Sequence, residues 1–204
     1  MLTLVIGNKN LSSWSLRPWL VLRHLGLPFQ EIKLTLDTPE FKVAVRRYSS
    51  AERVPVLLDG ELAIWDSLAI AEYANELAQG KGWPPDATLR AQARSISAEM
   101  HSGFAALRQC WPMQAVERLD VPLSPAAVAD VARIDEIWQA CLRKNGPWLF
   151  GEFSIADAMY APVVLRFNTY GAKLSAVAAD YARRVLDEPH LREWLREAQQ
   201  EVAR

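Results

Sequence analysis

Short apolar runs alternate with segments of helical periodicity over the first 80 residues. Four such runs are β-prone and are bounded by turn residues, which predicts β-strands. They cover residues 2–6, 29–34, 54–58 and 61–64. Helices are predicted between and after these strands, over residues 16–25, 39–47 and 66–77. Thr38 is the expected N-cap of the second of these helices. The resulting order, βαβαββα, predicts a small mixed sheet with helices on both faces.

A different pattern follows the Gly- and Pro-rich linker at residues 79–85. Apolar residues recur every three or four positions from Leu89 to Leu107, which predicts one long amphipathic helix that Pro112 stops or kinks. Four further helices are predicted over residues 131–141, 154–167, 175–186 and 189–202. We therefore expect an α/β plus all-α architecture, with an α/β domain over residues 1–80 and an all-helical domain over residues 86–204.

Charge, hydropathy and cysteine spacing argue against several classes of partner. The chain carries 23 basic and 24 acidic residues, and neither half is a basic patch, so we expect no nucleic-acid partner. No apolar stretch has the length of a membrane span, and the apolar start is too short for a signal peptide, so we expect a cytoplasmic protein without a membrane partner. Cys110 and Cys141 lack CxxC or metal spacing, which favours free thiols and predicts no metal.

Three serines mark the start of the first predicted helix, among them Ser12 and Ser13. A helix start offers unpaired N–H groups and positive potential. A serine hydroxyl there can cap the helix, or it can donate a hydrogen bond to an anion held at that end. If the anion is a thiolate, the hydroxyl and the helix dipole both favour its ionisation. On the residues alone, a plain N-cap remains the simpler interpretation.

Val54 and Pro55 open a predicted central strand, where a proline is unusual because it cannot donate to the ladder. A cis Val54–Pro55 bond would turn the preceding backbone outward. The N–H and C=O of Val54 could then pair with an extended peptide ligand, as an added strand would. An ordinary trans proline at a sheet edge is the alternative.

Asp66 and Ser67 open the third predicted helix. The N–H and hydroxyl of Ser67 can bind a carboxylate, and Asp66 can pair with an ammonium group. Together they suit the α-amino acid end of a ligand, with simple helix capping as the alternative. Ser154 and Asp157 form a capping box further along the chain, which we interpret as a folding signal.

Taken together, these motifs resemble the glutathione S-transferase superfamily over nearly the whole chain. The segments that carry the resemblance are Ser-Ser-x-Ser-x-Arg, Val-Pro, Asp-Ser-x-Ala-Ile-x-Glu-Tyr and Ser-Ile-Ala-Asp-Ala, in that order. The serine-rich start looks most like zeta-type and related bacterial members, in which it reads Ser-Ser-Cys-x-Trp-Arg. This sequence departs from that form, with Trp14 at the cysteine position and Leu16 at the tryptophan. The departure weighs against maleylacetoacetate isomerase activity.

The resemblance implies a thioredoxin-like N-terminal domain and roles for residues that match its motifs. Ser12 would hydrogen-bond the glutathione thiolate, with Ser13 as the alternative. Val54, before a cis Pro55, would pair with the cysteinyl part of glutathione. Asp66 and Ser67 would hold the γ-glutamyl end. For the glycyl carboxylate, Glu40 matches by spacing but has the wrong charge, so Lys42 is the candidate.

The resemblance also places the second substrate between the two domains. The candidates to line that cleft are His101, Phe104, Arg108 and Trp111. Core packing is the alternative for Phe104 and Trp111, and a hydrogen-bonded structural role is the alternative for His101. A homodimer is expected, with glutathione as co-substrate and no metal or further cofactor.

The sequence therefore predicts a glutathione transferase that activates the thiol of reduced glutathione and transfers it to an electrophilic small molecule. Conjugation, peroxide reduction and isomerisation all use such a thiolate, and detoxification is the expected context. The alternative is a non-catalytic glutathione-binding carrier or scaffold with the same fold. A thioredoxin-type disulfide enzyme is disfavoured, because no cysteine precedes Cys110.

Overall fold

Four strands and nine helices make up the chain in a computed structural model, which describes residues 1–203. The strands and the first three helices are β1 (Leu2–Ile6), α1 (Ser13–His24), β2 (Phe29–Lys33), α2 (Phe41–Arg46), β3 (Val56–Asp59), β4 (Leu62–Trp65) and α3 (Ser67–Leu77). The remaining helices are α4 (Ala87–Ser102), α5 (Ala105–Cys110), α6 (Pro125–Asn145), α7 (Ile155–Tyr170), α8 (Ala176–Leu186) and α9 (Pro189–Val202). This arrangement confirms the predicted βαβαββα unit followed by helices.

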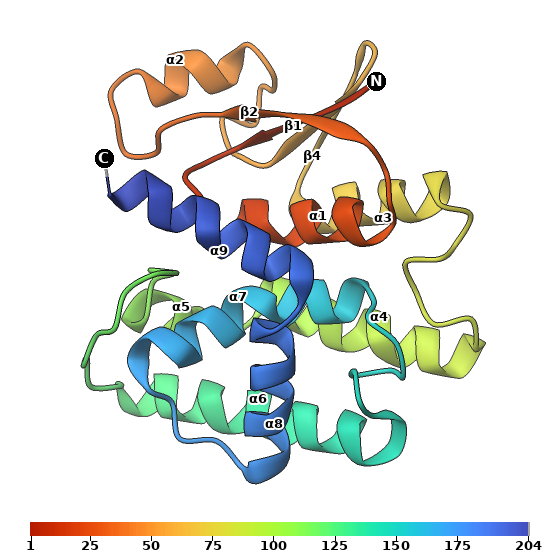
Figure 1. Cartoon of the computed structure of the whole chain (residues 1–204), viewed down its shortest axis with the longest axis vertical. Coiled ribbons are helices and arrows are strands. Elements are labelled where there is room, and N and C mark those ends of the chain that lie inside the picture. Colours follow the sequence, from red (N-terminus) through yellow and green to blue (C-terminus); the bar gives the residue numbers. More distant parts are fainter. Residues whose placement is uncertain (204) are drawn as a thin grey trace.

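The sheet has the order β2-β1-β3-β4 and is mixed, as predicted. β1 pairs parallel with β2 and antiparallel with β3, where Leu4 lies opposite Leu57. The β3–β4 hairpin turns at Gly60, whose positive φ of 59° suits glycine. Figure 1 shows α1 and α3 between the sheet and the helical part, and α2 on the other face. β3 begins at Val56, two residues later than predicted, because Pro55 has no N–H for the ladder.

The predicted single helix from Leu89 to Leu107 is wrong. The chain forms α4 and then the short α5, with Gly103 extended and Phe104 in the left-handed region at φ 55° between them. The first turn of α5 is completed by another helix, because the Leu107 N–H donates to Asp130 Oδ2 on α6 at 2.9 Å. Apolar spacing alone does not distinguish this break from a continuous helix.

The predicted cap of the second helix is also wrong. The Thr38 hydroxyl donates to the carbonyl of Thr35 at 3.2 Å and does not cap the helix. α2 begins at Phe41 after Glu40, whose side chain makes no capping hydrogen bond. A six-residue helix with a single buried residue, Val45, has little to define its first residue.

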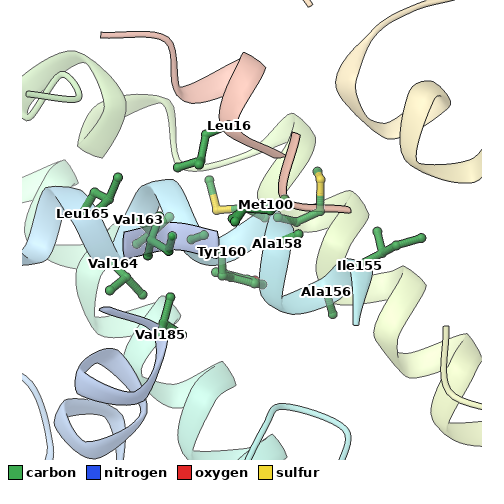
Figure 2. Packing of buried hydrophobic residues seen from close by; sticks show 14 of the residues in the cluster. Leu16, Met100, Ile155, Ala156, Ala158, Tyr160, Val163, Val164, Leu165 and Val185 are labelled. Atoms are coloured by element: carbon green, nitrogen blue, oxygen red, sulfur yellow. The ribbon is translucent and has the colours of Figure 1, made fainter. Parts of the chain in front are cut away.

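The hydrophobic core runs through both domains, and α7 lies at its centre. α1 packs against α3 on one side and α7 on the other. Figure 2 shows Leu16 of α1 directed at α7, with Met100 of α4 beside Ala158. All of these residues are fully buried. The two domains therefore share one continuous apolar contact, which fixes the position of the α1 N-terminus against the helical domain.

The Ser154–Asp157 capping box forms at the start of α7, as predicted. The Ser154 N–H donates to Asp157 Oδ2 at 2.9 Å, and the Tyr181 hydroxyl donates to Oδ1 at 3.0 Å. Asp157 is fully buried, and desolvation raises its pKa to about 6 although these hydrogen bonds oppose the shift. The box thus anchors α7 and joins it to α8.

Three further findings concern residues 1–203. In that range no helix combines the length and the apolar character needed to cross a membrane. The same residues contain no group of three or more His, Cys, Asp or Glu arranged to hold a metal ion. Cys110 and Cys141 are both free and half-buried, and burial raises the pKa of the Cys141 thiol to about 11.

Candidate active site

A cavity of about 570 Å³ opens where the N-terminal ends of α1 and α3 meet α4 and the segment before β3. Its walls are formed by aromatic rings, by the backbone that precedes β3 and by the N-terminal end of α3. The lining residues are Trp14, Ala51, Arg53, Val54, Pro55, Trp65, Asp66, Ser67 and His101. Two motifs that are separate in the sequence, Val-Pro and Asp-Ser, therefore face the same space.

Val54 and Pro55 are joined by a cis peptide bond. The chain pairs into β3 only from Val56 onward, so Val54 stays outside the sheet. Among residues 1–203, the N–H and C=O of Val54 have no hydrogen-bond partner. A free donor and a free acceptor on one residue at a cavity wall match the backbone of an extended peptide.

Asp66 caps α3 and holds an uncommon backbone conformation, with φ 76°. Its Oδ1 accepts hydrogen bonds from the N–H groups of Leu68 at 2.8 Å and Ala69 at 3.2 Å. Oδ2 lies 3.0 Å from His101 Nε2. A left-handed backbone at a non-glycine residue costs free energy, and such residues gather at functional sites. The carboxylate is thus held in place by α3 and presented to the cavity.

Ser67 follows as the first residue of α3. Its hydroxyl oxygen is buried and has no hydrogen-bond partner within residues 1–203. A buried hydroxyl without a partner is costly, and a ligand oxygen at this helix start would satisfy it. Asp66 and Ser67 therefore offer an anionic and a neutral polar group side by side.

Ser12 and Ser13 lie at the start of α1, and both are buried. Ser12 is the N-cap, and its hydroxyl donates to Ser15 Oγ at 2.7 Å while accepting from the Ser15 N–H at 3.3 Å. Ser13 Oγ accepts from Arg166 Nη2 at 3.3 Å. Neither serine belongs to the residues that line the cavity, whereas the next residue, Trp14, does.

The other predicted residues divide between the cavity and its surroundings. His101 lines the cavity. Phe104 and Trp111 are buried in the hydrophobic core, and the Trp111 ring stacks on Tyr170 at 5.1 Å. Arg108 is half-buried and donates to the His101 carbonyl at 3.3 Å. Lys42 is exposed on α2, outside the cavity lining.

Trp14, Arg53 and Trp65 line the cavity and were absent from the residues selected from the sequence. Arg53 and Trp65 directly precede Val54 and Asp66, so adjacency to the two motifs was the available signal. Trp14 had a weaker signal, namely its place within the serine motif. Trp65 is 53% exposed, which leaves a large aromatic face open at the cavity rim.

Positive charge gathers around Trp14. Burial and the neighbouring guanidiniums of Arg166 and Arg108 lower the pKa of Arg17 to about 9. Burial and Arg108 lower the pKa of Arg166 to about 10, and burial also lowers the pKa of Arg108. The pKa values fall because the three cations are buried and lie near one another. A nearby anion would therefore be stabilised by this cluster.

The chain matches two family models that together span most of its length. Residues 11–77 match the N-terminal domain of glutathione S-transferases, and residues 90–197 match the C-terminal domain. The chain belongs to the glutathione S-transferase family. The cavity just described lies where these two domains of the transferase meet, with Asp66 on one side and His101 on the other.

Solved structures share the fold of this transferase. A glutathione transferase homolog from Burkholderia gl BGR1 with bound glutathione is 23% identical, with 98% of each chain covered and a TM-score of 0.72. A diazinon-metabolizing glutathione S-transferase of the silkworm Bombyx mori is 18% identical, with 99% of each chain covered and a TM-score of 0.77. A theta class enzyme of Xanthomonas axonopodis pv. citri with bound glutathione is 22% identical, with coverage of 95% and 96% and a TM-score of 0.69.

One curated relative shares a shorter stretch. The dichloromethane dehalogenase of Methylorubrum extorquens is 37% identical over 60 residues, which is 28% of this chain. The match spans 21% of the length of that relative.

Proposed function

We propose that this protein is a glutathione transferase that binds reduced glutathione in the cavity beside Val54, Asp66 and Ser67. The observation that carries the proposal is that the Val54 backbone and the Ser67 hydroxyl, at the cavity wall, have no hydrogen-bond partner among residues 1–203. The free N–H and C=O of Val54 match the cysteinyl backbone of the tripeptide. Ser67 matches the γ-glutamyl carboxylate, and Asp66 matches its ammonium group.

The glycyl carboxylate of glutathione calls for a cation near the same wall. Lys42 is the candidate from the family resemblance, yet its side chain is exposed on α2 outside the cavity lining. Arg53 lines the cavity directly before Val54. A guanidinium can hold a carboxylate through two parallel hydrogen bonds, so we favour Arg53 for this role over Lys42.

Thiol activation is assigned to Ser12, with Ser13 as the alternative, as in a serine-type, zeta-like transferase. The thiol loses its proton to solvent water, the sulfur bonds to the electrophilic carbon of the second substrate, and the leaving group departs with its bonding electrons. The α1 dipole and a serine hydroxyl favour the thiolate over the thiol. Ser12 would exchange its hydrogen bond to Ser15 Oγ for one to sulfur. Catalysis then rests on ionisation and positioning.

Relatives support a role with electrophilic foreign compounds. One is named a dichloromethane dehalogenase and another a diazinon-metabolizing transferase, and each name gives a small foreign compound as what that protein acts on. We extend this to a cytoplasmic homodimer that acts in detoxification by conjugation, with peroxide reduction and isomerisation as further reactions of the same thiolate. Domain limits of residues 1–80 and 86–204 belong to the same proposal.

A non-catalytic glutathione carrier is the second candidate, and one observation favours it. Ser12 and Ser13 are already bonded to Ser15 and Arg166, and neither lines the cavity. A ligand could therefore occupy the cavity without contact between its sulfur and a serine hydroxyl.

Serine substitutions separate the two candidates. We expect Ser12→Ala to lower kcat with a chlorodinitrobenzene electrophile about a hundredfold, and to raise the pKa of bound glutathione as read from thiolate absorbance. The matched control is Ser102→Ala on α4, where the hydroxyl donates only to the Ala98 carbonyl. Unchanged turnover in both Ser12→Ala and Ser13→Ala, with glutathione binding retained, would favour the carrier.

A further inference from the structure

Three arginines from three helices converge beside the cavity. The Arg17 guanidinium carbon of α1 lies 4.3 Å from the centre of the Trp14 ring, and that of Arg108 on α5 lies 5.4 Å from it. Arg166 of α7 reaches Ser13, the neighbour of Trp14. Trp14 itself forms part of the cavity wall, so the cluster lies directly against that wall.

Among residues 1–203, none of these cations forms a salt bridge, although Asp66 lies near enough to favour the charged form of Arg17 and Asp130 does the same for Arg108. Arg166 donates to the carbonyls of Trp111 and Pro162 and to the Ser13 hydroxyl, all of which are neutral. Within residues 1–203, the Arg108 side chain donates one hydrogen bond, to the neutral His101 carbonyl. Arg17 is 1% exposed, and its Nε and Nη1 have no hydrogen-bond partner at all. Buried charges are normally paired, so the three arginines lack a directly bonded anion although two carboxylates lie further off.

Stacking on Trp14 compensates only part of the cost of burying Arg17. A cation over an aromatic face gains electrostatic energy, but the in-plane N–H donors remain unsatisfied. Those planar donors match the two oxygens of a carboxylate. The feature that would complete the cluster is therefore a planar anion that enters from the cavity.

We propose that the Arg17, Arg108 and Arg166 cluster binds the carboxylate of the second substrate, so that this protein prefers electrophiles that carry a carboxylate. The inference rests on the proposed transferase function and names the substrate class of the same site. Arg108 is half-buried and meets the anion first. Arg17 then binds the same anion once the half-buried Trp14 ring rotates away from it.

The position of the cluster assigns the anion to the second substrate and not to glutathione. The groups proposed for glutathione, Val54, Asp66 and Ser67, all come from the sheet domain. Arg108 and Arg166 come from the helical domain, so glutathione lying along the sheet domain leaves its carboxylates away from them. The thiolate carries one charge, and three desolvated cations accommodate a further anion.

A matched pair of electrophiles tests the proposal. Chlorodinitrobenzoate and its methyl ester both react by attack of the glutathione sulfur on the chlorine-bearing carbon, with loss of chloride, and they differ in charge. For each, kcat/KM is divided by the rate constant of the uncatalysed reaction to remove intrinsic reactivity. We expect the resulting ratio of acid to ester to be at least about tenfold for the unaltered protein.

Arginine variants assign the preference to the cluster. Arg108→Gln and Arg17→Gln each lower the ratio about tenfold, and Arg108→Lys lowers it less because the charge remains. The matched control is Arg90→Gln, since Arg90 also donates only to backbone carbonyls, those of Pro84 and Pro85, and lies outside the cavity lining. If Arg17→Gln fails to fold by circular dichroism, the half-buried Arg108 decides the result.

A binding arm separates failure of this proposal from failure of the proposed function. Dinitrobenzoate and its methyl ester, which lack chlorine, are titrated calorimetrically into the protein with and without glutathione. Tighter binding of the acid that Arg108→Gln abolishes supports the cluster, even if neither electrophile is turned over. An acid-to-ester ratio within about twofold of one, or equal losses for both electrophiles in Arg108→Gln, overturns it.

Discussion

His101 Nε2 lies 3.0 Å from Asp66 Oδ2, which joins the helical domain to the helix start that presents the proposed glutathione site. His101 also meets the edge of the Trp14 ring, with 5.4 Å between the ring centres. One imidazole thus contacts a carboxylate proposed for glutathione and an indole that covers the arginine cluster. The two halves of the cavity are therefore coupled through a residue of α4.

Replacing His101 tests this coupling. We expect His101→Leu to raise the KM for glutathione about threefold to tenfold with a smaller change in kcat, because Asp66 Oδ2 loses the imidazole that lies 3.0 Å from it and helps to orient it. Steady-state kinetics and calorimetric titration with S-methylglutathione measure the effect. His190→Leu on α9 is the control, since His190 lies near Glu193 and away from the cavity. Equal KM values in the two variants would count against the coupling.

The cap on α5 predicts a stability effect. Asp130→Ala should lower the free energy of unfolding by about 1 kcal/mol, because the Leu107 N–H loses its acceptor at a helix start. Asp130→Asn keeps an acceptor oxygen and should recover most of this loss. Urea unfolding followed by circular dichroism gives both values. A loss of the same size in both variants would mean that charge, and not the capping oxygen, is responsible.

Lys9 connects the sheet domain to the C-terminal helix. Its Nζ lies 2.6 Å from Glu197 and 2.8 Å from Glu31, and the side chain is 1% exposed. Lys9→Met leaves both carboxylates without this partner and should cost about 2 kcal/mol of unfolding free energy, since both remain partly solvated.

Lys33→Met is the matched control for Lys9. Lys33 also pairs with α9, through Glu201 at 2.7 Å, but it is 47% exposed. An exposed pair contributes little, so this variant should cost less than about 1 kcal/mol. Chemical unfolding of both proteins measures the difference. Equal losses would show that burial of Lys9 adds nothing.

The buried Asp157 predicts a pH effect on stability. Desolvation raises its pKa from 3.8 to about 6 in the folded protein, so the folded state holds the proton more tightly than the unfolded state. The resulting stabilisation is present below pH 4 and is lost as the pH rises through 6. This shift corresponds to about 3 kcal/mol.

Asp157→Asn removes that titration and tests the sign. The variant lacks the ionising carboxyl, so its stability relative to the unaltered protein should improve by about 2–3 kcal/mol from pH 4 to pH 7. Unfolding free energies from urea titrations at several pH values provide the comparison. A constant difference across that range would show that Asp157 does not titrate there.

Strand and helix predictions were confirmed where the deciding residues lie within a few positions of one another in the sequence. The Asp59-Gly60 turn set the β3–β4 hairpin, and the Ser154–Asp157 box set the start of α7. Predictions were wrong where the deciding group is distant in the sequence. Asp130 completes α5 from 23 residues away, so apolar spacing alone predicted one helix in place of two.

The candidate site divides in the same way. Cap and turn chemistry was enough to select Val54, Pro55, Asp66 and Ser67, and all four line one cavity. Sequence alone did not select Trp14, Arg53 or Trp65, because their exposure to the cavity depends on how three separate segments meet. Phe104 and Trp111 matched a cleft by helical position but lie in the core.

By itself, the sequence determined the βαβαββα order of the first 80 residues, the Ser154–Asp157 capping box and the Val-Pro and Asp-Ser motifs, whose peptide-binding role stays a prediction. These features depend on backbone geometry and hydrogen bonding over a few residues, which residue type largely specifies. Only the tertiary structure decided that His101 meets Asp66, and that Arg17, Arg108 and Arg166 gather without a salt bridge among residues 1–203. Such contacts follow from the packing of α1 against α7, which sums many apolar contacts between residues far apart in the chain.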